Sequence, residues 1–482
     1  MKRCQPYIDG QFVVSKTTEM IPVTNPATGE IISEIPECTI EETRQAIEAA
    51  ESAQASWAKL PAIERAGYLH KIAQKIRENF HHLVRVISEE QGKIISLAEA
   101  EVNFTADYMD YMAEWARRYE GEIIPSDRPN EHILLFKVPI GVIGGVLPWN
   151  FPFLLIARKM APALVTGNTI VIKPSEETPN NAFEFAKLAA EAGLPAGVFN
   201  VVYGRGGVVG KELASNPKIG MISFTGSVDT GSKIMAAAAK NITKVSLELG
   251  GKAPAIVMDD ADIELAVRSI KASRVINSGQ ACNCAERIYV HEKIAEQFIA
   301  EISVAMSSTK YGDPLIETDL EMGPLINEQG LAKVESLVAS AVAAGAKVET
   351  GGKRASRDKG YFYEPTVLTN LSHDMEIMHK EIFGPVLLIM TFKDLDEAIA
   401  LANDSEYGLT SSIYTQNLDI AMRACKEIKF GETYVNRENF EAIQGFHAGM
   451  RKSGIGGADG KHGLEEYLQT HIVYIQYDMS KK

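Results

Sequence analysis

Two cysteines one residue apart, Cys282 and Cys284, lie in the segment INSGQACNCAERIYV (276–290) of a chain with five cysteines. C-x-C is not a common spacing for structural zinc, and no His/Cys cluster accompanies it. A thioredoxin-type redox centre would use C-x-x-C, and a disulfide between such close neighbours would be strained. The residues alone therefore leave two interpretations open: a nucleophilic thiol, or a pair of buried, inert thiols.

The composition narrows the class of protein. The chain has 482 residues and a formal net charge of −14, with no long basic run, which disfavours nucleic acids and anionic membranes as main partners. The N-terminal segment lacks the apolar core of a signal peptide, and no uncharged apolar run is long enough to span a bilayer. An odd number of scattered cysteines is typical of a reducing compartment, so the sequence predicts a cytoplasmic protein.

The elements that must position the cysteines follow two repeating patterns. Before residue 140 the sequence predicts short strands and amphipathic helices near 40–60, 62–91 and 96–119. From Ile140, short Val/Ile-rich runs that end in Gly, Pro or Ser alternate with helical segments, and the alternation restarts after Gly250. This pattern predicts an α/β protein with a Rossmann-like doubly wound parallel sheet and a second α/β domain.

The predicted domain boundaries follow from these patterns. Residues 1–118 and 140–249 are expected to form the first α/β domain, and residues 250–460 the second. Residues 119–139 and 465–482 contain extended segments that fit neither repeating pattern. Strands with exposed edges usually find partners, so these segments are predicted to form a small β oligomerisation element, in a homotetramer by resemblance to the family described next.

The order G-Q-x-C at 279–282, with Arg287 five residues beyond Cys282, resembles the active-site segment of the NAD(P)-dependent aldehyde dehydrogenase superfamily. Further motifs of that family stand in the family's order along the chain. They are PWNFP (148–152), KPSEETP (173–179), FTGS (224–227), LELGGK (247–252), EIFGPV (381–386) and KSGIG (452–456). The resemblance runs from about Pro6 to the C-terminus.

The resemblance implies a covalent mechanism for oxidising an aldehyde. Cys282 would add to the carbonyl, and the resulting thiohemiacetal would pass its hydride to NAD. Asn150 and the backbone N–H of Cys282 would stabilise the oxyanion. Glu248, which lies 34 residues before Cys282, would activate the water that hydrolyses the thioester. Cys284 has no role in this pattern, and no metal is expected.

The resemblance implies that residues 1–118 and 140–249 form the NAD-binding domain and that residues 250–460 form the catalytic domain. NAD would bind mainly through the turn F-T-G-S and the helix that follows it, whose N-terminus suits a pyrophosphate. Glu176 would accept from ribose hydroxyls and repel a 2′-phosphate, which favours NAD over NADP. The candidate cofactor-binding residues are Trp149, Lys173, Ser175, Glu176, Gly206, Gly226, Ser227, Glu381 and Phe383.

The candidate substrate residues are Phe151, Arg158, Glu441 and His447, and three of them are charged or polar where many relatives have aromatics. Buried polar groups need partners. Either Arg158 and Glu441 pair with each other and narrow the tunnel, or the substrate is short and hydroxylated, or carries an anionic group for Arg158. Within the superfamily, the chain looks closest to bacterial lactaldehyde/glycolaldehyde dehydrogenases.

Several alternatives stay open at this point. A semialdehyde or sulfolactaldehyde dehydrogenase of the same superfamily could also use Arg158. A CoA-acylating aldehyde dehydrogenase would pass the thioester to a thiol, which Glu248 disfavours. A catalytically silent relative tends to lose the nucleophile, which is present here. A cysteine hydrolase would need a histidine paired with Cys282, and the sequence singles out none of its ten histidines.

Overall fold

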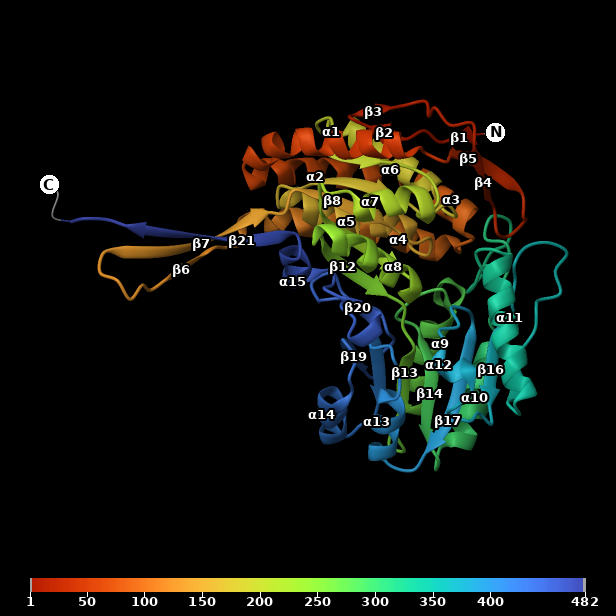
Figure 1. The fold of residues 1–482 in the computed structure, drawn as a ribbon. Coiled ribbons are helices and arrows are strands. Elements are labelled where there is room, and N and C mark those ends of the chain that lie inside the picture. The colour runs from red at the N-terminus through yellow and green to blue at the C-terminus, as the bar shows by residue number, and fades with distance from the viewer. Residues whose placement is uncertain (1, 480–482) are drawn as a thin grey trace.

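The computed structural model describes residues 2–479. It contains two α/β bodies, one above the other in Figure 1, and an arm of strands that projects from the upper body. The prediction of an α/β fold with a Rossmann-like sheet and a second sheet domain is confirmed. No helix within residues 2–479 is both long enough and apolar enough to cross a membrane.

The upper body is built on an eight-stranded sheet with the order β20-β12-β11-β8-β9-β10-β2-β3. Its central strands are parallel, and they are β8 (Val142–Val146), β9 (Thr169–Lys173), β10 (Phe199–Val201), β11 (Ile219–Gly226) and β12 (Lys244–Leu249). The antiparallel edges are β2 (Tyr7–Ile8), β3 (Gln11–Phe12) and β20 (Gly454–Ile455). The chain passes from β8 to β9 on one side and returns to β11 on the other, so the topological switch point lies between β8 and β11.

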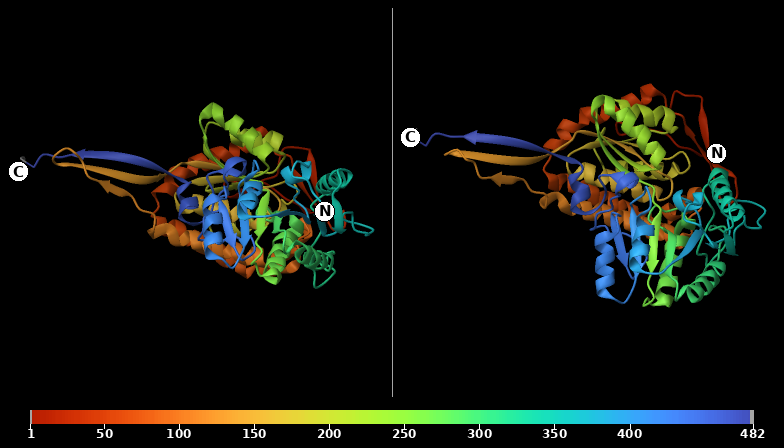
Figure 2. Two further views of the ribbon diagram at one scale, coloured as in Figure 1. Left: turned by 90° about the horizontal axis from the view of Figure 1, so that it is seen from below. Right: turned by 60° about the horizontal axis from the view of Figure 1, so that its bottom comes forward.

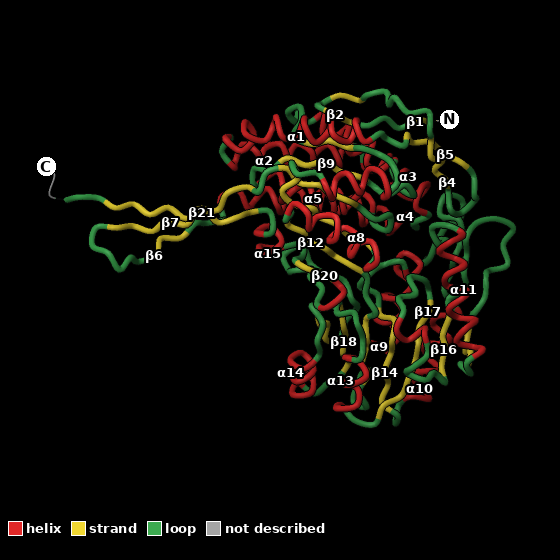
Figure 3. The backbone as a smooth tube through the Cα atoms, in the orientation of Figure 1, coloured by secondary structure: helices red, strands yellow, loops and turns green. Residues whose placement is uncertain are grey.

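Helices cover both faces of this sheet, and Figure 3 shows how much of the upper body they occupy. They are α1 (Ile40–Lys59), α2 (Ala62–Glu78), α3 (Phe80–Gln91), α4 (Ile95–Ala113), α5 (Pro152–Val165), α6 (Asn180–Glu191), α7 (Lys211–Ser215), α8 (Val228–Ala238) and α15 (Gly460–Glu465). Every residue of α5 is buried, which makes it the central helix of the core. The predicted single helix at 62–91 is two helices, because the Asn79 side chain donates to the carbonyl of Lys75 and ends α2.

The lower body has a seven-stranded sheet with the order β15-β16-β17-β14-β13-β18-β19, parallel except for β15. Its strands are β13 (Ala253–Val257), β14 (Ala285–His291), β15 (Lys347–Thr350), β16 (Thr366–Thr369), β17 (Val386–Phe392), β18 (Thr410–Tyr414) and β19 (Glu432–Val435). Its helices are α9 (Ile263–Val275), α10 (Ala295–Ser307), α11 (Glu328–Ala343), α12 (Glu376–His379), α13 (Leu395–Asn403) and α14 (Leu418–Glu427).

The two sheets face each other with opposite strand ends. The last of the parallel strands of the upper sheet, β12, leads through Gly250–Lys252 directly into the first strand of the lower sheet, β13. The carboxyl ends of the upper strands therefore meet the amino ends of the lower strands. Whatever binds between the bodies contacts loops that follow upper strands and loops that precede lower strands.

The arm is a three-stranded antiparallel sheet of β6 (Glu122–Ile124), β7 (Glu131–Pro139) and β21 (Leu468–Gln476). It joins the two segments that the sequence assigned to neither body, and β21 pairs with β7 along its whole length. Figure 2 shows that the arm projects from the body in both views. A further small sheet, of β1 (Lys2–Arg3), β5 (Ile31–Pro36) and β4 (Met20–Thr24), lies near the N-terminus.

Candidate active site

Cys282 lies on a tight loop between α9 and β14. Asn277 and Ser278 adopt left-handed backbone angles (φ 48° and 60°), and Gly279 continues the turn at φ 74°. A side chain on Gly279 would lie 2.2 Å from the carbonyl oxygen of Gly384, so only glycine fits there. The Gln280 side chain donates to the Asn277 carbonyl (2.9 Å). These constraints hold the thiol at the boundary between the two bodies, where it is partly exposed.

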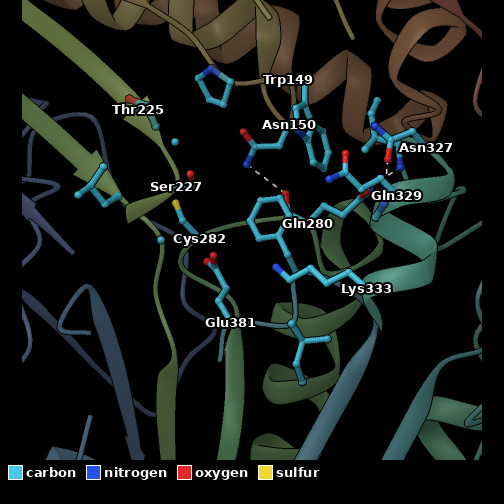
Figure 4. A pocket seen from close by; sticks show the side chains of 18 of the residues that line it. Trp149, Asn150, Thr225, Ser227, Gln280, Cys282, Asn327, Gln329, Lys333 and Glu381 are labelled. Atoms are coloured by element: carbon cyan, nitrogen blue, oxygen red, sulfur yellow. Dashed lines mark hydrogen bonds between the residues drawn. The ribbon is translucent and has the colours of Figure 1, made fainter. Parts of the chain in front are cut away.

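Asn150 comes from the upper body, just before α5, and its side chain points toward the cysteine loop. Its Nδ2 donates to the backbone oxygen of Gln280 (3.1 Å), the contact drawn in Figure 4. Its own carbonyl accepts from Lys93 Nζ (2.8 Å) and Asn277 Nδ2 (3.0 Å). The amide nitrogen carries two hydrogens and uses one of them in these contacts, which leaves the second for a substrate oxygen.

Glu248 is the penultimate residue of β12, lines the same cleft as the thiol and is buried. Its Oε2 accepts from Thr225 Oγ1 (3.3 Å), and Thr225 in turn accepts from Lys159 Nζ (2.9 Å). Burial lowers the pKa of Lys159 to about 8. This chain of contacts orients the Glu248 carboxylate without any direct bond to a cation in the part of the chain that the structure describes.

A cleft of about 470 Å³ lies between the two bodies and contains Cys282 (Figure 4). Trp149 and Ser227 line it from loops after upper strands, and Glu381 and Phe383 from a loop before a lower strand. The ring of Phe383 stands edge-on to Trp149, with centroids 5.4 Å apart. The cleft opens at the switch point of the upper sheet, where ligands of doubly wound folds bind.

A second, smaller cavity of about 50 Å³ lies on the far side of the thiol. It shares Asn150, Thr225, Glu248 and Cys282 with the cleft. A water needs about 10–15 Å³ of such space, so the cavity holds a molecule of only a few heavy atoms. The four shared side chains therefore lie between the large cleft and the small cavity.

An ion-pair network forms one wall of the small cavity. Arg158, on the buried helix α5, donates through Nη2 to Glu441 Oε1 and to Asp459 Oδ2, each at 2.9 Å. Glu441 also accepts from the side chain of Asn283 (2.7 Å). The predicted Arg158–Glu441 pair is therefore present, but a second carboxylate, which the sequence interpretation did not include, shares the same guanidinium.

His447 lies in the same wall and is 2% exposed. Its Nδ1 lies 2.5 Å from Glu432 Oε1. Burial alone would lower the pKa of His447, but the Glu441 and Glu432 carboxylates and the Cys282 thiol raise it well above its usual value. His447 therefore places a positive charge beside the sulfur, on the substrate side.

The aldehyde dehydrogenase family model matches residues 12–473. Lactaldehyde dehydrogenase of Escherichia coli (strain K12) is 65% identical over 98% of each chain, and a crystal structure titled lactaldehyde dehydrogenase from Escherichia coli superposes with a TM-score of 0.98 at 64% identity, covering 98% of this chain and 99% of that one. Glutarate-semialdehyde dehydrogenase of Pseudomonas aeruginosa is 41% identical over 97% of this chain and 96% of its own.

The chain belongs to the aldehyde dehydrogenase family.

This membership confirms the family predicted from the motifs around Cys282 and the assignment as an aldehyde dehydrogenase. The fold of this aldehyde dehydrogenase brings most of the predicted site residues together. Those that line the cleft are Trp149, Asn150, Gly226, Ser227, Glu248, Cys282, Glu381 and Phe383. Those that line the small cavity are Asn150, Phe151, Arg158, Glu248, Cys282, Glu441 and His447.

Four predicted cofactor residues do not line either of these two spaces. Lys173 is the last residue of β9, Ser175 and Glu176 follow it, and Lys173 Nζ contacts Glu176 Oε2 at 3.0 Å. Gly206 begins the π-helical turn Gly206–Gly210 that follows β10. All four therefore lie at or just after the carboxyl ends of upper strands, on the same edge of the sheet as Ser227.

Sequence reasoning missed several residues of the site. Glu432, Asn283 and Asp459 hold the polar wall, and Lys333 lines the cleft from α11. The one available signal was the pair of basic residues in the apolar helix segment FLLIARKMAPALV, because a buried cation requires a buried partner. Nothing in the local sequence indicates which carboxylate that partner is.

The cleft has the chemistry that a dinucleotide requires. Ser227 caps the start of α8, a helix N-terminus that suits a pyrophosphate, and Gly226 beside it has no side chain to obstruct an approach. At the other end, the Glu381 carboxylate accepts from the backbone N–H of Gly251 (2.9 Å). Burial, followed by the nearby Glu286 carboxylate, raises the pKa of Glu381 to about 7. The residues present therefore fit a nicotinamide dinucleotide.

Proposed function

We propose that this aldehyde dehydrogenase oxidises lactaldehyde, glycolaldehyde or a similarly short hydroxyaldehyde to the carboxylic acid, with NAD. The small polar cavity beside Cys282 carries the proposal. It has space for a few heavy atoms, and Glu441 and His447 offer hydrogen-bond partners that an unsubstituted aldehyde cannot use. The high identity to a protein named lactaldehyde dehydrogenase supports the same substrate class.

In this proposal, Cys282 is the nucleophile that forms a thiohemiacetal with the aldehyde carbon. The oxygen of that adduct faces the free N–H of Asn150 Nδ2, whose position the Gln280 carbonyl fixes. A donor held in place in this way stabilises the negative charge without having to reorganise. When bound, NAD supplies the acceptor for the hydride of the aldehyde carbon.

Glu248 then completes the reaction by removing a proton from a water molecule, whose oxygen attacks the thioester carbon. The C–S bond breaks, the acid leaves, and the sulfur of Cys282 returns as a thiolate. Glu248 lines both the cleft and the small cavity, so a water next to its carboxylate reaches the acyl carbon from the cleft side.

For NAD, we propose that residues 1–118 and 140–249 supply the binding domain and that residues 250–460 supply the thiol. Ser227 and Gly226 hold the pyrophosphate and Glu381 and Phe383 the nicotinamide half, with Trp149 at the wall. Glu176, paired with Lys173 and 35% exposed, accepts from the adenosine ribose and disfavours a 2′-phosphate. Ser175 and Gly206 lie beside it along the same sheet edge.

The affinity for NAD is expected to fall as the pH drops below 7. The Glu381 carboxyl group accepts a hydrogen bond from a ribose hydroxyl more strongly when it is ionised, and its pKa is about 7. The ionised fraction falls from about nine-tenths at pH 8 to about one-tenth at pH 6, so the Kd for NAD rises roughly tenfold. Calorimetric titration across this pH range measures the Kd for NAD. Glu381→Gln is the control, and its Kd is expected not to change with pH. A constant wild-type Kd would remove Glu381 from cofactor binding.

The proposed substrate is tested by following reduced nicotinamide with lactaldehyde, glycolaldehyde and propanal, each with NAD or NADP. We expect kcat/KM for lactaldehyde to exceed that for propanal at least tenfold, because the polar wall can bind the hydroxyl group of lactaldehyde, which propanal lacks. NAD is expected to be preferred. Equal values for lactaldehyde and propanal would contradict the proposal, and formation of acyl-CoA in place of free acid when CoA is added would favour the CoA-acylating alternative.

We further propose that the protein is a cytoplasmic homotetramer assembled through its arm. The arm exposes apolar side chains on a projecting sheet, which is unusual for a surface that faces water alone. These side chains are Ile123, Ile124, Phe136, Ile472, Tyr474 and Ile475. Other copies of the chain are the partners that the sequence predicted for them.

A further inference from the structure

Arg158 contacts two carboxylates through a single nitrogen. Within residues 2–479, no other side chain in the wall of the small cavity does so. Arg158 Nη2 lies 2.9 Å from Glu441 and 2.9 Å from Asp459. Arg158 is 5% exposed and Asp459 is fully buried. Glu441 lines the cavity, whereas Asp459 lies behind Arg158 and does not line it. The two carboxylates thus hold the guanidinium from the cavity side and from the protein interior.

The backbone at Asp459 is strained. Its angles, φ 71° and ψ 161°, lie in a region that is essentially restricted to glycine. The chain nevertheless has an aspartate there, and its Oδ2 contacts Arg158 while its Oδ1 has no hydrogen-bond partner in the described part of the chain. A strained, buried carboxylate with one satisfied oxygen gains little stability for the fold. The contact with Arg158 therefore explains why the chain has an aspartate at position 459.

The charged groups around the cavity include more carboxyl groups than cations. Arg158 and His447 are the cations, and they face the carboxyl groups of Glu441, Asp459, Glu432 and Glu248. The hydroxyl of Tyr108, on α4, is close enough to Asp459 for the two to interact electrostatically. Burial raises the pKa of Asp459 to about 6, so this carboxyl is ionised at pH 8 and opposes the charge of Arg158.

We infer that Asp459 is a specificity-determining residue, which neutralises Arg158 from behind so that the cavity accepts uncharged hydroxyaldehydes and rejects aldehydes that carry an anionic group. The inference rests on the proposed function and deepens it, because it states which of the substrates compatible with an arginine the wall excludes. Asp459 touches no substrate and acts through Arg158, so it is a positioning residue.

The test compares glycolaldehyde with glyoxylate, two aldehydes of two carbons each that differ in having a hydroxymethyl or a carboxylate group. At pH 8, Asp459→Asn is expected to raise the ratio of kcat/KM for glyoxylate to that for glycolaldehyde roughly tenfold. The change should appear in a lower KM for glyoxylate, while kcat for glycolaldehyde changes little. A variant that is merely less stable would have a lower kcat/KM for both substrates, and the ratio of the two values would be unchanged.

Two more variants make the result specific. Asp459→Gly removes the carboxylate and also the backbone strain, so it is expected to fold at least as well as the wild type and to shift the ratio in the same direction. The double variant Arg158→Gln/Asp459→Asn should lose the gain, because the cation that attracts glyoxylate is gone. A gain that persists in the double variant, or an unchanged ratio in both single variants, overturns the inference.

The wild-type protein supplies an independent outcome. A wild type that already oxidises glyoxylate with a higher kcat/KM than glycolaldehyde overturns the inference without any variant. A wild type that oxidises other aldehydes but neither glycolaldehyde nor lactaldehyde overturns the proposed function instead. The two failures are therefore distinguishable.

Discussion

Replacing Cys282 with alanine is expected to reduce aldehyde oxidation roughly 10⁴- to 10⁶-fold, as is typical when a covalent nucleophile is removed. Cys282 is the cysteine that lines both the cleft and the small cavity, and the contacts of Gly279 and Gln280 hold its loop in place. Without the sulfur no thiohemiacetal forms, so there is no carbon from which a hydride can readily pass to NAD. Steady-state production of reduced nicotinamide measures the effect, and the cofactor affinity should be unchanged because the cleft keeps its other walls.

Cys284 provides the matched control for this prediction. It stands two residues away, but it is buried, and burial raises the pKa of its thiol to about 12. A thiol of this kind is not ionised near neutral pH and does not attack a carbonyl. Cys284→Ala is expected to retain activity within a few-fold of the wild type. The assignment of the nucleophile fails if Cys282→Ala keeps its activity or if Cys284→Ala loses it.

Replacing Glu248 with glutamine is expected to slow turnover about 10²- to 10⁴-fold, the usual contribution of a general base. The amide is nearly the same size as the carboxylate and can still accept from Thr225 Oγ1, so the geometry of the site should persist. The nucleophile is intact, and the first half of the reaction therefore proceeds. The thioester then accumulates because no base activates the water.

Rapid mixing distinguishes this defect from a general loss of activity. Glu248→Gln should give a burst of reduced nicotinamide close to one equivalent per active site, followed by a slow steady state. Glu466→Gln is the control: this glutamate binds Lys244 at the opposite end of β12 (2.9 Å), away from the thiol. It should behave as the wild type. A variant of Glu248 without a burst would place its role before the thioester.

The sequence by itself determined the features that are local. Alternating apolar runs and Gly/Pro/Ser turns predicted the central strands of both sheets, because strand and helix periodicity is set by neighbouring residues. Cys282, Asn150 and Glu248 each belong to a short motif at the end of a strand or in a loop, and the structure brings the three together. The single helix predicted over 62–91 was wrong at Asn79, where a side-chain hydrogen bond ends the helix.

Only the tertiary structure decided which distant residues contact each other at the site between the two bodies. The lower sheet presents the amino ends of its strands to the site, because β12 leads directly into β13, and strand patterns do not specify that direction. Arg158 finds Asp459 at a separation of 301 residues, and His447 finds Glu432 on β19. The sequence can indicate that a buried charge requires a partner. The identity of that partner depends on how distant segments pack, because the free energy of pairing is set by distance and burial and not by position along the chain.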